Sequence, residues 1–266
     1  MSDTFLGLAG KVAVVSGASK GIGAAVTTAL LRQGVKVLAL SRTRLPDSVS
    51  GPALAVGASA GADLVWLGVD LMADGACERA LATAMEAYGR VDILSNNAGS
   101  TRPGDFFALS DQAWEQGFGL KFHGARRLSK TCWPALKASG GCIVNTIGIM
   151  SRTAVIDYAM GGAVNSALLH LTKALAHQGA RDGVRVNAVN PGHIATDRLD
   201  TAINALMEEK SIGRAQAESL LLAKSGITRF GTTEEVAATI CFLASPAASF
   251  VNGSILEVDG GETRGT

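Results

Sequence analysis

Short apolar runs rich in β-branched residues alternate along the chain with longer segments whose apolar residues recur at helical spacing. Seven runs of the first kind are typical of buried parallel strands, namely Val12–Ser16, Val35–Leu40, Leu64–Val69, Val91–Ser95, Cys142–Ile147, Val184–Val189 and Ser254–Val258. The main helical segments are Ile22–Leu31, Asp74–Tyr88, Asp111–Lys137, Asp157–Arg181 and Thr233–Ala244. This alternation predicts an α/β fold, a doubly wound sheet of about seven parallel strands with helices on both faces.

Two segments interrupt the alternation. Thr43–Gly61 contains two prolines and three glycines, which make a regular helix unfavourable, so we expect a short or broken helix there. Thr196–Phe230 is far longer than an ordinary connection and contains apolar residues at helical spacing. We interpret it as a helical lid near 196–230; a packing or oligomer-contact subdomain is the alternative. Since the sequence contains neither a linker nor a repeat, residues 1–266 are predicted to form one domain.

The first strand runs into a glycine-rich turn that opens a helix. The turn comprises Gly17, Ser19, Lys20, Gly21, Ile22 and Gly23. Gly17 permits the turn, Gly21 allows a close backbone approach, and Gly23 lets the helix pack closely. Free N–H groups and the positive end of the helix dipole meet here, which indicates an anion site suited to the pyrophosphate of a dinucleotide.

The composition argues against two classes of protein and indicates a cellular compartment. The 266 residues are 47% hydrophobic and 18% charged, with a net charge of +1. This balance argues against disorder and against a nucleic-acid partner. Four scattered cysteines without a CxxC spacing indicate reduced core thiols and a cytoplasmic protein. We expect neither a signal peptide nor a membrane span.

Several motifs occur together in one order. They are SGASKGIG (16–23), NNAG (96–99), a tyrosine at the start of a helix, NPGHIATD (190–197) and a C-terminal VNGSILEVDGG. Over essentially its whole length the chain resembles the short-chain dehydrogenase/reductase family. The resemblance implies a Rossmann-type domain, a nicotinamide cofactor, a small-molecule carbonyl or alcohol substrate, and a homodimer or homotetramer.

The residues at the expected cofactor site favour NADP(H) over NAD(H). Ser41 stands where an NAD-selecting carboxylate is usual, Arg42 follows it, and Lys20 lies in the glycine turn. These cations would attract a 2′-phosphate. The alternative is that both are surface cations. By resemblance, Asp70 and Leu71 lie at the adenine, and Asn97, Ala98 and Gly99 line the adenosine ribose. The resemblance likewise places Pro191, Gly192, Ile194 and Thr196 around the nicotinamide.

The catalytic residues depart from the family pattern. Tyr158 matches the family's tyrosine, which acts as proton donor or acceptor. The usual lysine position four residues later is Gly162, and the usual serine position is Gly148. Ser151 and Thr146 are alternative hydroxyls, and the sequence does not choose between them.

Lys121 occupies the position where the family has an asparagine, seven residues after Trp114. It lies in an otherwise apolar helical stripe, where an ammonium group is costly unless it has partners. Either Lys121 extends to the surface, or it replaces the missing lysine and stabilises the Tyr158 phenolate or holds a ribose hydroxyl. In the second case we expect direct or one-water contact with the phenol.

Two functions are consistent with these residues. The first is an NADP(H)-dependent oxidoreductase that uses Tyr158 and Lys121. The second is a catalytically impaired dinucleotide-binding protein that acts as a sensor or partner subunit. His193 is either a contact for substrate or cofactor or a solvated loop histidine, and we assign no metal site.

Overall fold

The computed structural model describes residues 6–50, 54–56 and 63–263 and is built around one parallel sheet. Its strands are β1 (Val12–Ser16), β2 (Lys36–Ser41), β3 (Leu54–Val56), β4 (Leu64–Gly68), β5 (Ile93–Asn96), β6 (Cys142–Thr146), β7 (Arg185–Pro191) and β8 (Ile255–Val258). They are ordered β3-β4-β2-β1-β5-β6-β7-β8, so β1 pairs with β2 on one side and with β5 on the other. The predicted doubly wound α/β fold is confirmed. Sheets of this kind bind ligands at such a reversal of strand order.

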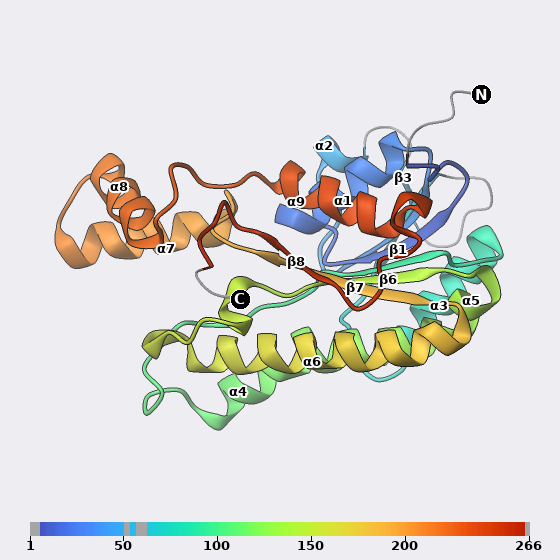
Figure 1. Cartoon of the computed structure of the whole chain (residues 1–266), viewed down its shortest axis with the longest axis horizontal. Helices are drawn as coiled ribbons and strands as arrows, with labels where there is room; N and C mark the ends of the chain where they lie inside the picture. Colours follow the sequence, from blue (N-terminus) through green and yellow to red (C-terminus); the bar gives the residue numbers. More distant parts are fainter. Residues whose placement is uncertain (1–5, 51–53, 57–62, 264–266) are drawn as a thin grey trace.

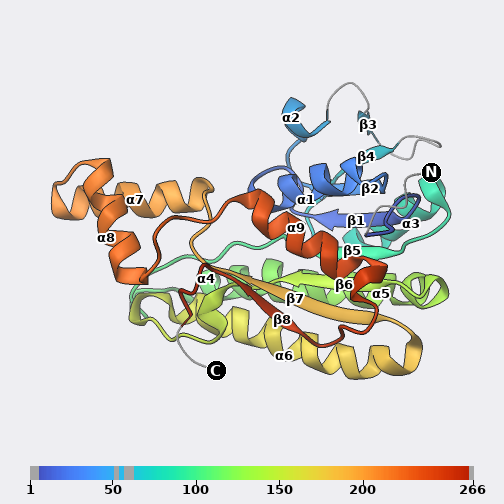
Figure 2. The same ribbon diagram turned by 45° about the horizontal axis from the view of Figure 1, so that its top comes forward.

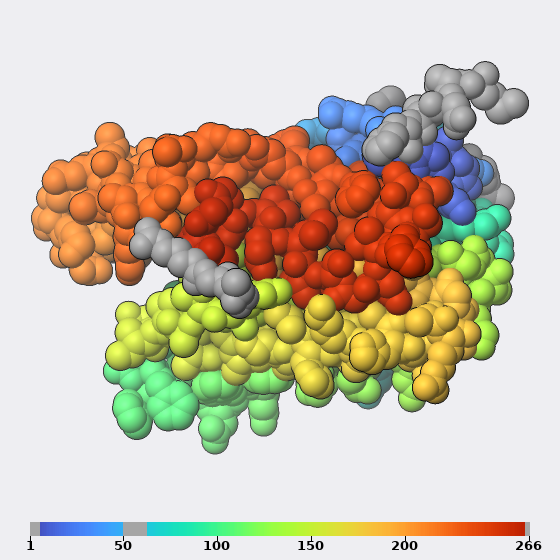
Figure 3. Space-filling view, viewed as in Figure 1, coloured from blue at the N-terminus to red at the C-terminus, as the bar shows by residue number. Residues whose placement is uncertain are grey.

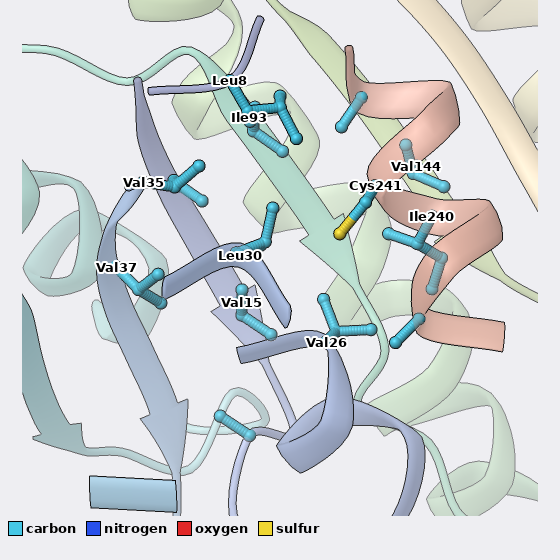
Figure 4. Close-up of a cluster of buried hydrophobic side chains, with 14 of the residues drawn as sticks. Leu8, Val15, Val26, Leu30, Val35, Val37, Ile93, Val144, Ile240 and Cys241 are labelled. Carbon is cyan, nitrogen blue, oxygen red and sulfur yellow. The ribbon is translucent and has the colours of Figure 1, made fainter. Parts of the chain in front are cut away.

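Helices cover both faces of the sheet (Figures 1 and 2). They are α1 (Gly21–Arg32), α2 (Asp47–Ser50), α3 (Ala76–Tyr88), α4 (Asp111–Gly117), α5 (Ala125–Ser139), α6 (Ala159–Asp182), α7 (Asp197–Lys210), α8 (Arg214–Ser225) and α9 (Thr233–Ala244). Successive strand residues serve opposite faces. Val15 packs in one core with Val26 of α1 and Ile240 of α9 (Figure 4), whereas Val14 packs in the core of α3 and α5. Because both faces are covered, β1 is buried along its whole length.

The segment Thr43–Gly61 contains the expected short helix and one strand more than the apolar pattern predicts. The helix α2 has four residues. β3 pairs in parallel with β4 through only three residues, too few for an apolar run to stand out. The described part of the sheet therefore has eight strands. Residues 51–53 and 57–61 of this segment lie outside the described residues.

The predicted helix Asp111–Lys137 is continuous but not uniform. Between α4 and α5 lies a π-helical segment, η2 (Phe118–Gly124), which contains Lys121. A π-helical turn takes up more residues than an α-helical turn and therefore changes the direction of the side chains that follow. Such segments are frequent at functional sites, and here the segment places Lys121 at the carboxyl edge of the sheet.

The segment 196–230 forms a pair of helices, α7 and α8, that projects from the body at the left of Figure 1. The pair has a small core of its own, with Leu199, Ile203 and Ala217 buried. Figure 3 shows the molecular surface hollowed between this pair, in orange, and the yellow-green segment that precedes α6. This placement at the carboxyl edge of the sheet is compatible with the proposed lid.

The four cysteines are free and buried. Burial raises the pKa of the Cys142 thiol to about 11, so this thiol is unreactive near neutrality. Within the described ranges, no helix is long and apolar enough to cross a membrane.

Candidate active site

The glycine turn after β1 is closed by contacts that leave no space for a side chain. Gly17 and Gly21 have positive φ angles of 69° and 54°. A Cβ added to Gly17 would lie 2.9 Å from the Cα of Ala98, and one added to Gly23 would lie 2.2 Å from the carbonyl oxygen of Gly17. The first turn of α1 contains no acidic residue. The turn therefore fits a bound pyrophosphate, because its backbone is accessible and the helix terminus is not neutralised.

Replacing Gly23 with Ala is expected to lower the free energy of unfolding by about 1–3 kcal/mol, because the added methyl group meets backbone that has to shift. Urea unfolding measures this loss, and a cofactor titration should show binding weakened at least about tenfold. Gly213→Ala is the control, since a Cβ at Gly213 meets nothing within 4 Å. Equal stability and affinity in the two variants would contradict this account of the turn.

The NNAG segment after β5 is fixed against the glycine turn by one serine. The hydroxyl oxygen of Ser16 accepts hydrogen bonds from the N–H groups of Asn97 (3.0 Å) and Ala98 (3.1 Å). Ser16 ends β1, whereas the two amides follow β5, so the bonds span the point where the strand order reverses. The structure thus brings two groups of predicted cofactor residues together.

The side chains predicted to select the cofactor differ in whether they already have a hydrogen-bond or ion-pair partner. Ser41 is buried, donates to the carbonyl of Thr43 (2.6 Å) and accepts from the indole of Trp66 (2.9 Å). Lys20 forms an exposed ion pair with Asp197 (3.3 Å). Arg42 is exposed at the end of β2. The serine hydroxyl is therefore already engaged, whereas the arginine side chain is accessible.

The other predicted cofactor residues lie at the same edge. The Asp70 carboxylate accepts from the N–H of Met72 (2.9 Å), and the Leu71 side chain is buried in the core. Thr196 lies over the glycine turn, because a Cβ added to Gly21 would be 3.4 Å from its methyl group. Pro191 and Ile194 are buried, and Gly192 lies between them.

His193 is neither free nor fully solvated. Its Nδ1 lies 2.7 Å from Glu262, and its backbone N–H donates to the same carboxylate (3.1 Å). Ser225 Oγ lies 3.3 Å from the same ring nitrogen. The histidine therefore links the NPGH loop to the C-terminal segment and to α8, and the solvated-loop interpretation is wrong.

The phenol of Tyr158 has two direct partners that the sequence analysis missed. Its oxygen lies 2.5 Å from Thr101 Oγ1 and accepts a hydrogen bond from Arg198 (3.3 Å). The tyrosine ring packs on Gly161, where an added Cβ would lie 2.0 Å from Cε1. Thr101 comes two residues after the NNAG motif, and Arg198 is the second residue of α7. Their positions just after β5 and β7 were the available signal, since the carboxyl ends of parallel strands share one edge.

Neither alternative hydroxyl is bonded to the phenol. Ser151 Oγ bonds with the side-chain amide of Asn190 instead (3.0 Å to Nδ2). Thr146 Oγ1 is buried and has no hydrogen-bond partner among the described residues. Thr101 is thus the hydroxyl that this structure places beside Tyr158.

Lys121 is buried, with 9% of its surface exposed, so the surface-lysine interpretation is wrong. Its stem packs on Gly99, where an added Cβ would lie 2.9 Å from Lys121 Cδ, and its ammonium donates to the carbonyl of Ile147. Burial, together with repulsion from Arg198, lowers the lysine pKa to about 7. Among the described residues, the ammonium has no direct hydrogen bond to Tyr158. Contact through one water stays a prediction.

Comparisons with known proteins show what the whole chain is similar to. A family model described as enoyl-(acyl carrier protein) reductase matches residues 17–263. The short-chain reductase protein NovJ of Streptomyces niveus is 32% identical over 253 residues, which cover 94% of this chain and 93% of the relative. Acetoacetyl-CoA reductase of Rhizobium meliloti is 31% identical over 258 residues, which cover 95% and 98%. L-Sorbose reductase from Gluconobacter frateurii, solved with NADPH and L-sorbose, is similar in structure with a TM-score of 0.87, 27% identity and coverage of 99% and 100%.

The glycine turn, the NNAG segment and the tyrosine that precedes α6 lie at one edge of the sheet, and the matches extend over nearly the whole chain. The chain therefore belongs to the short-chain dehydrogenase/reductase family of oxidoreductases.

Proposed function

We propose that this protein is an NADP(H)-dependent oxidoreductase that interconverts a small carbonyl compound and its alcohol. The observation that carries the proposal is the setting of the Tyr158 phenol, which bonds with a hydroxyl and with a guanidinium group. A phenol so placed can give its proton to a substrate oxygen, because the guanidinium stabilises the negative charge that the phenol then acquires.

Tyr158, Thr101 and Lys121 have separate roles in the proposed reaction. When bound, the nicotinamide supplies or accepts the hydride. In the reducing direction Tyr158 donates one proton to the carbonyl oxygen, and solvent returns a proton to the phenolate afterwards. Thr101 orients the substrate oxygen through the hydroxyl that it presents beside the phenol. Lys121, held between Gly99 and Ile147, supplies the positive charge that the glycine at position 162 cannot.

The cofactor residues of the proposal come from five segments at the carboxyl edge, which follow β1, β2, β4, β5 and β7. The glycine turn holds the pyrophosphate, and Arg42 holds the 2′-phosphate. Asp70 and Leu71 are assigned to the adenine, Asn97 to Gly99 to the ribose, and Pro191, Gly192, Ile194 and Thr196 to the nicotinamide. The exposed guanidinium of Arg42 and the lack of a carboxylate at Ser41 support the phosphate assignment.

Replacing Arg42 with Asp is expected to weaken NADPH binding by about 10–100-fold, because it removes a charge-assisted contact with the 2′-phosphate and adds a repulsion. The ratio of NADPH affinity to NADH affinity should fall as a result. Thermal shifts at matched NADPH and NADH concentrations measure both effects. Arg44→Asp is the control, because it makes the same change of net charge two residues along the same exposed segment. If the two variants behave alike, both cations act only as surface charge.

The impaired dinucleotide-binding protein is the second candidate, and the glycines at positions 148 and 162 favour it. The two candidates differ in turnover. A wild-type protein that shifts its melting temperature with NADPH, yet oxidises no NADPH with any member of a panel of aldehydes, ketones and oxo acids, supports the second candidate and excludes the first.

We also propose that the protein is a cytoplasmic homo-oligomer. Free buried thiols suit a reducing compartment. A row of aromatic side chains supports assembly, since Trp114 stacks with Phe118 at 6.4 Å and both are only half-buried. Sedimentation of the purified chain measures its oligomeric state.

A further inference from the structure

Arg198 lies beside Tyr158 in the candidate active site and has no ion-pair partner among the described residues. It lies in the first turn of α7, is exposed, and donates from its guanidinium to the Tyr158 oxygen (3.3 Å). A phenol is a neutral partner and leaves the other donors of the guanidinium free.

The other arginines of the segment 196–230 are neutralised. Arg214 pairs with Asp200 (2.6 Å), and Arg229 pairs with Glu235 (2.6 Å). Among the described residues no carboxylate lies within ion-pair distance of Arg198. The segment thus pairs each arginine that lies away from the phenol and leaves unpaired the one beside it.

A second basic group, Lys121, is affected by the charge of Arg198 and has no ion-pair partner in the part of the chain that the structure describes. The buried ammonium of Lys121 donates to the carbonyl of Ile147, which carries no net charge. Repulsion from Arg198 contributes to the lowered pKa of this lysine, so the two cations act on each other. Among the described residues neither cation has an ion-pair partner, and two such cations form a site that an anion would stabilise.

We propose that Arg198 binds the carboxylate of the substrate, so that the preferred substrates are 2-oxo or 3-oxo carboxylic acids and the corresponding hydroxy acids. The inference rests on the proposed function, in which the substrate carbonyl oxygen lies within hydrogen-bond distance of the Tyr158 oxygen. Since the guanidinium contacts this same oxygen, it reaches a carboxyl group attached to the carbonyl carbon or one carbon away. A planar guanidinium binds such a group through two parallel hydrogen bonds.

The test compares each acid with its methyl ester, which keeps the carbonyl and removes the negative charge. We expect wild type to reduce 2-oxobutanoate or acetoacetate with kcat/KM at least about tenfold above that for the methyl ester. Arg198→Gln should lower kcat/KM for both compounds, because the guanidinium also stabilises the phenolate, but the loss for the acid should be at least about tenfold larger than the loss for the ester. Arg198→Lys should restore part of the loss, and Arg214→Gln should leave the acid-to-ester ratio unchanged.

Two outcomes overturn the inference. The first is a wild-type enzyme that prefers the esters or reduces only uncharged carbonyl compounds, in which case the proposed function still holds. The second is an Arg198→Gln variant that loses acid and ester reduction equally, since the arginine would then act on the phenol alone. If no carbonyl compound is reduced at all, the proposed function fails as well.

A binding measurement tests the anion site without turnover. With NADP⁺ present, oxalate should raise the melting temperature of wild type and of Tyr158→Phe, and this shift should be absent in Arg198→Gln. Equal shifts in the three proteins, or no shift in wild type, place the anion elsewhere and overturn the inference even if activity is found.

Discussion

Tyr158→Phe is expected to lower kcat by about 10²–10⁴-fold while leaving NADPH affinity within about twofold. The variant removes the hydroxyl bonded to Thr101 and Arg198 but keeps the ring, which packs on Gly161. The loss should therefore come from proton transfer and not from a displaced helix. Steady-state reduction of a carbonyl substrate and a thermal shift with NADPH separate the two effects.

The chain contains a matched control, because it has only one other tyrosine. The hydroxyl of Tyr88 donates to the carbonyl of Val37 (3.0 Å) near the amino end of β2, whereas the predicted chemistry lies at the carboxyl edge of the sheet. Tyr88→Phe should cost about 1 kcal/mol of unfolding free energy through the lost hydrogen bond and leave kcat unchanged. Full activity in Tyr158→Phe would remove the basis for the proposed mechanism.

Lys121→Met is expected to raise stability and to lower kcat by about 10²-fold, so that the two properties change in opposite directions. Methionine fills the same space without a charge, and burying the ammonium is unfavourable. The gain in unfolding free energy should be about 1–3 kcal/mol near pH 6, after allowing for the lost bond to Ile147.

The pH dependence follows from the lysine pKa, which is about 7 in the folded protein. In the unfolded chain a lysine titrates near pH 10.4. Between these values the unfolded chain binds one more proton, so the contribution of Lys121 to wild-type stability rises with pH. Below about pH 7 the full cost of burying the charged Lys121 ammonium is present.

The stability advantage of Lys121→Met over wild type should therefore be largest near pH 6 and shrink toward pH 10, which urea unfolding at several pH values measures. Activity that needs the charged amine should fall as pH rises through about 7.

A second substitution tests whether Lys121 replaces the missing lysine. Gly162 lies in α6 with a helical backbone, and an added Cβ meets only the Met150 carbonyl, at 3.3 Å. Adding Gly162→Lys to Lys121→Met should raise kcat at least about tenfold above that of Lys121→Met alone, whereas adding Gly162→Ala should leave it unchanged. Unchanged activity in Lys121→Met, or equal rescue by lysine and alanine, would show that the ammonium has no part in the reaction.

The sequence by itself determined the features that depend on neighbours in the chain. Alternating apolar runs predicted the doubly wound sheet, because a strand covered on both faces must be apolar at successive positions. The glycine turn was readable because part of its geometry is fixed within a few residues, as the approach of Gly23 to Gly17 shows, whereas the approach of Gly17 to Ala98 was not. Tyr158 was found from its motif, and Lys121 from its conflict with an apolar stripe.

Only the tertiary structure decided which groups meet. Thr101 and Arg198 are separated from Tyr158 by 57 and 40 residues, and they reach it because the segments after β5, β6 and β7 converge on one edge of the sheet. The direction of Lys121 depended on the π-helical segment, which an α-helical spacing does not anticipate. Spacing along the chain shows which side chains are available to a site. Strand order and the path of each connection set the distances between those side chains and the surroundings that act on their charges.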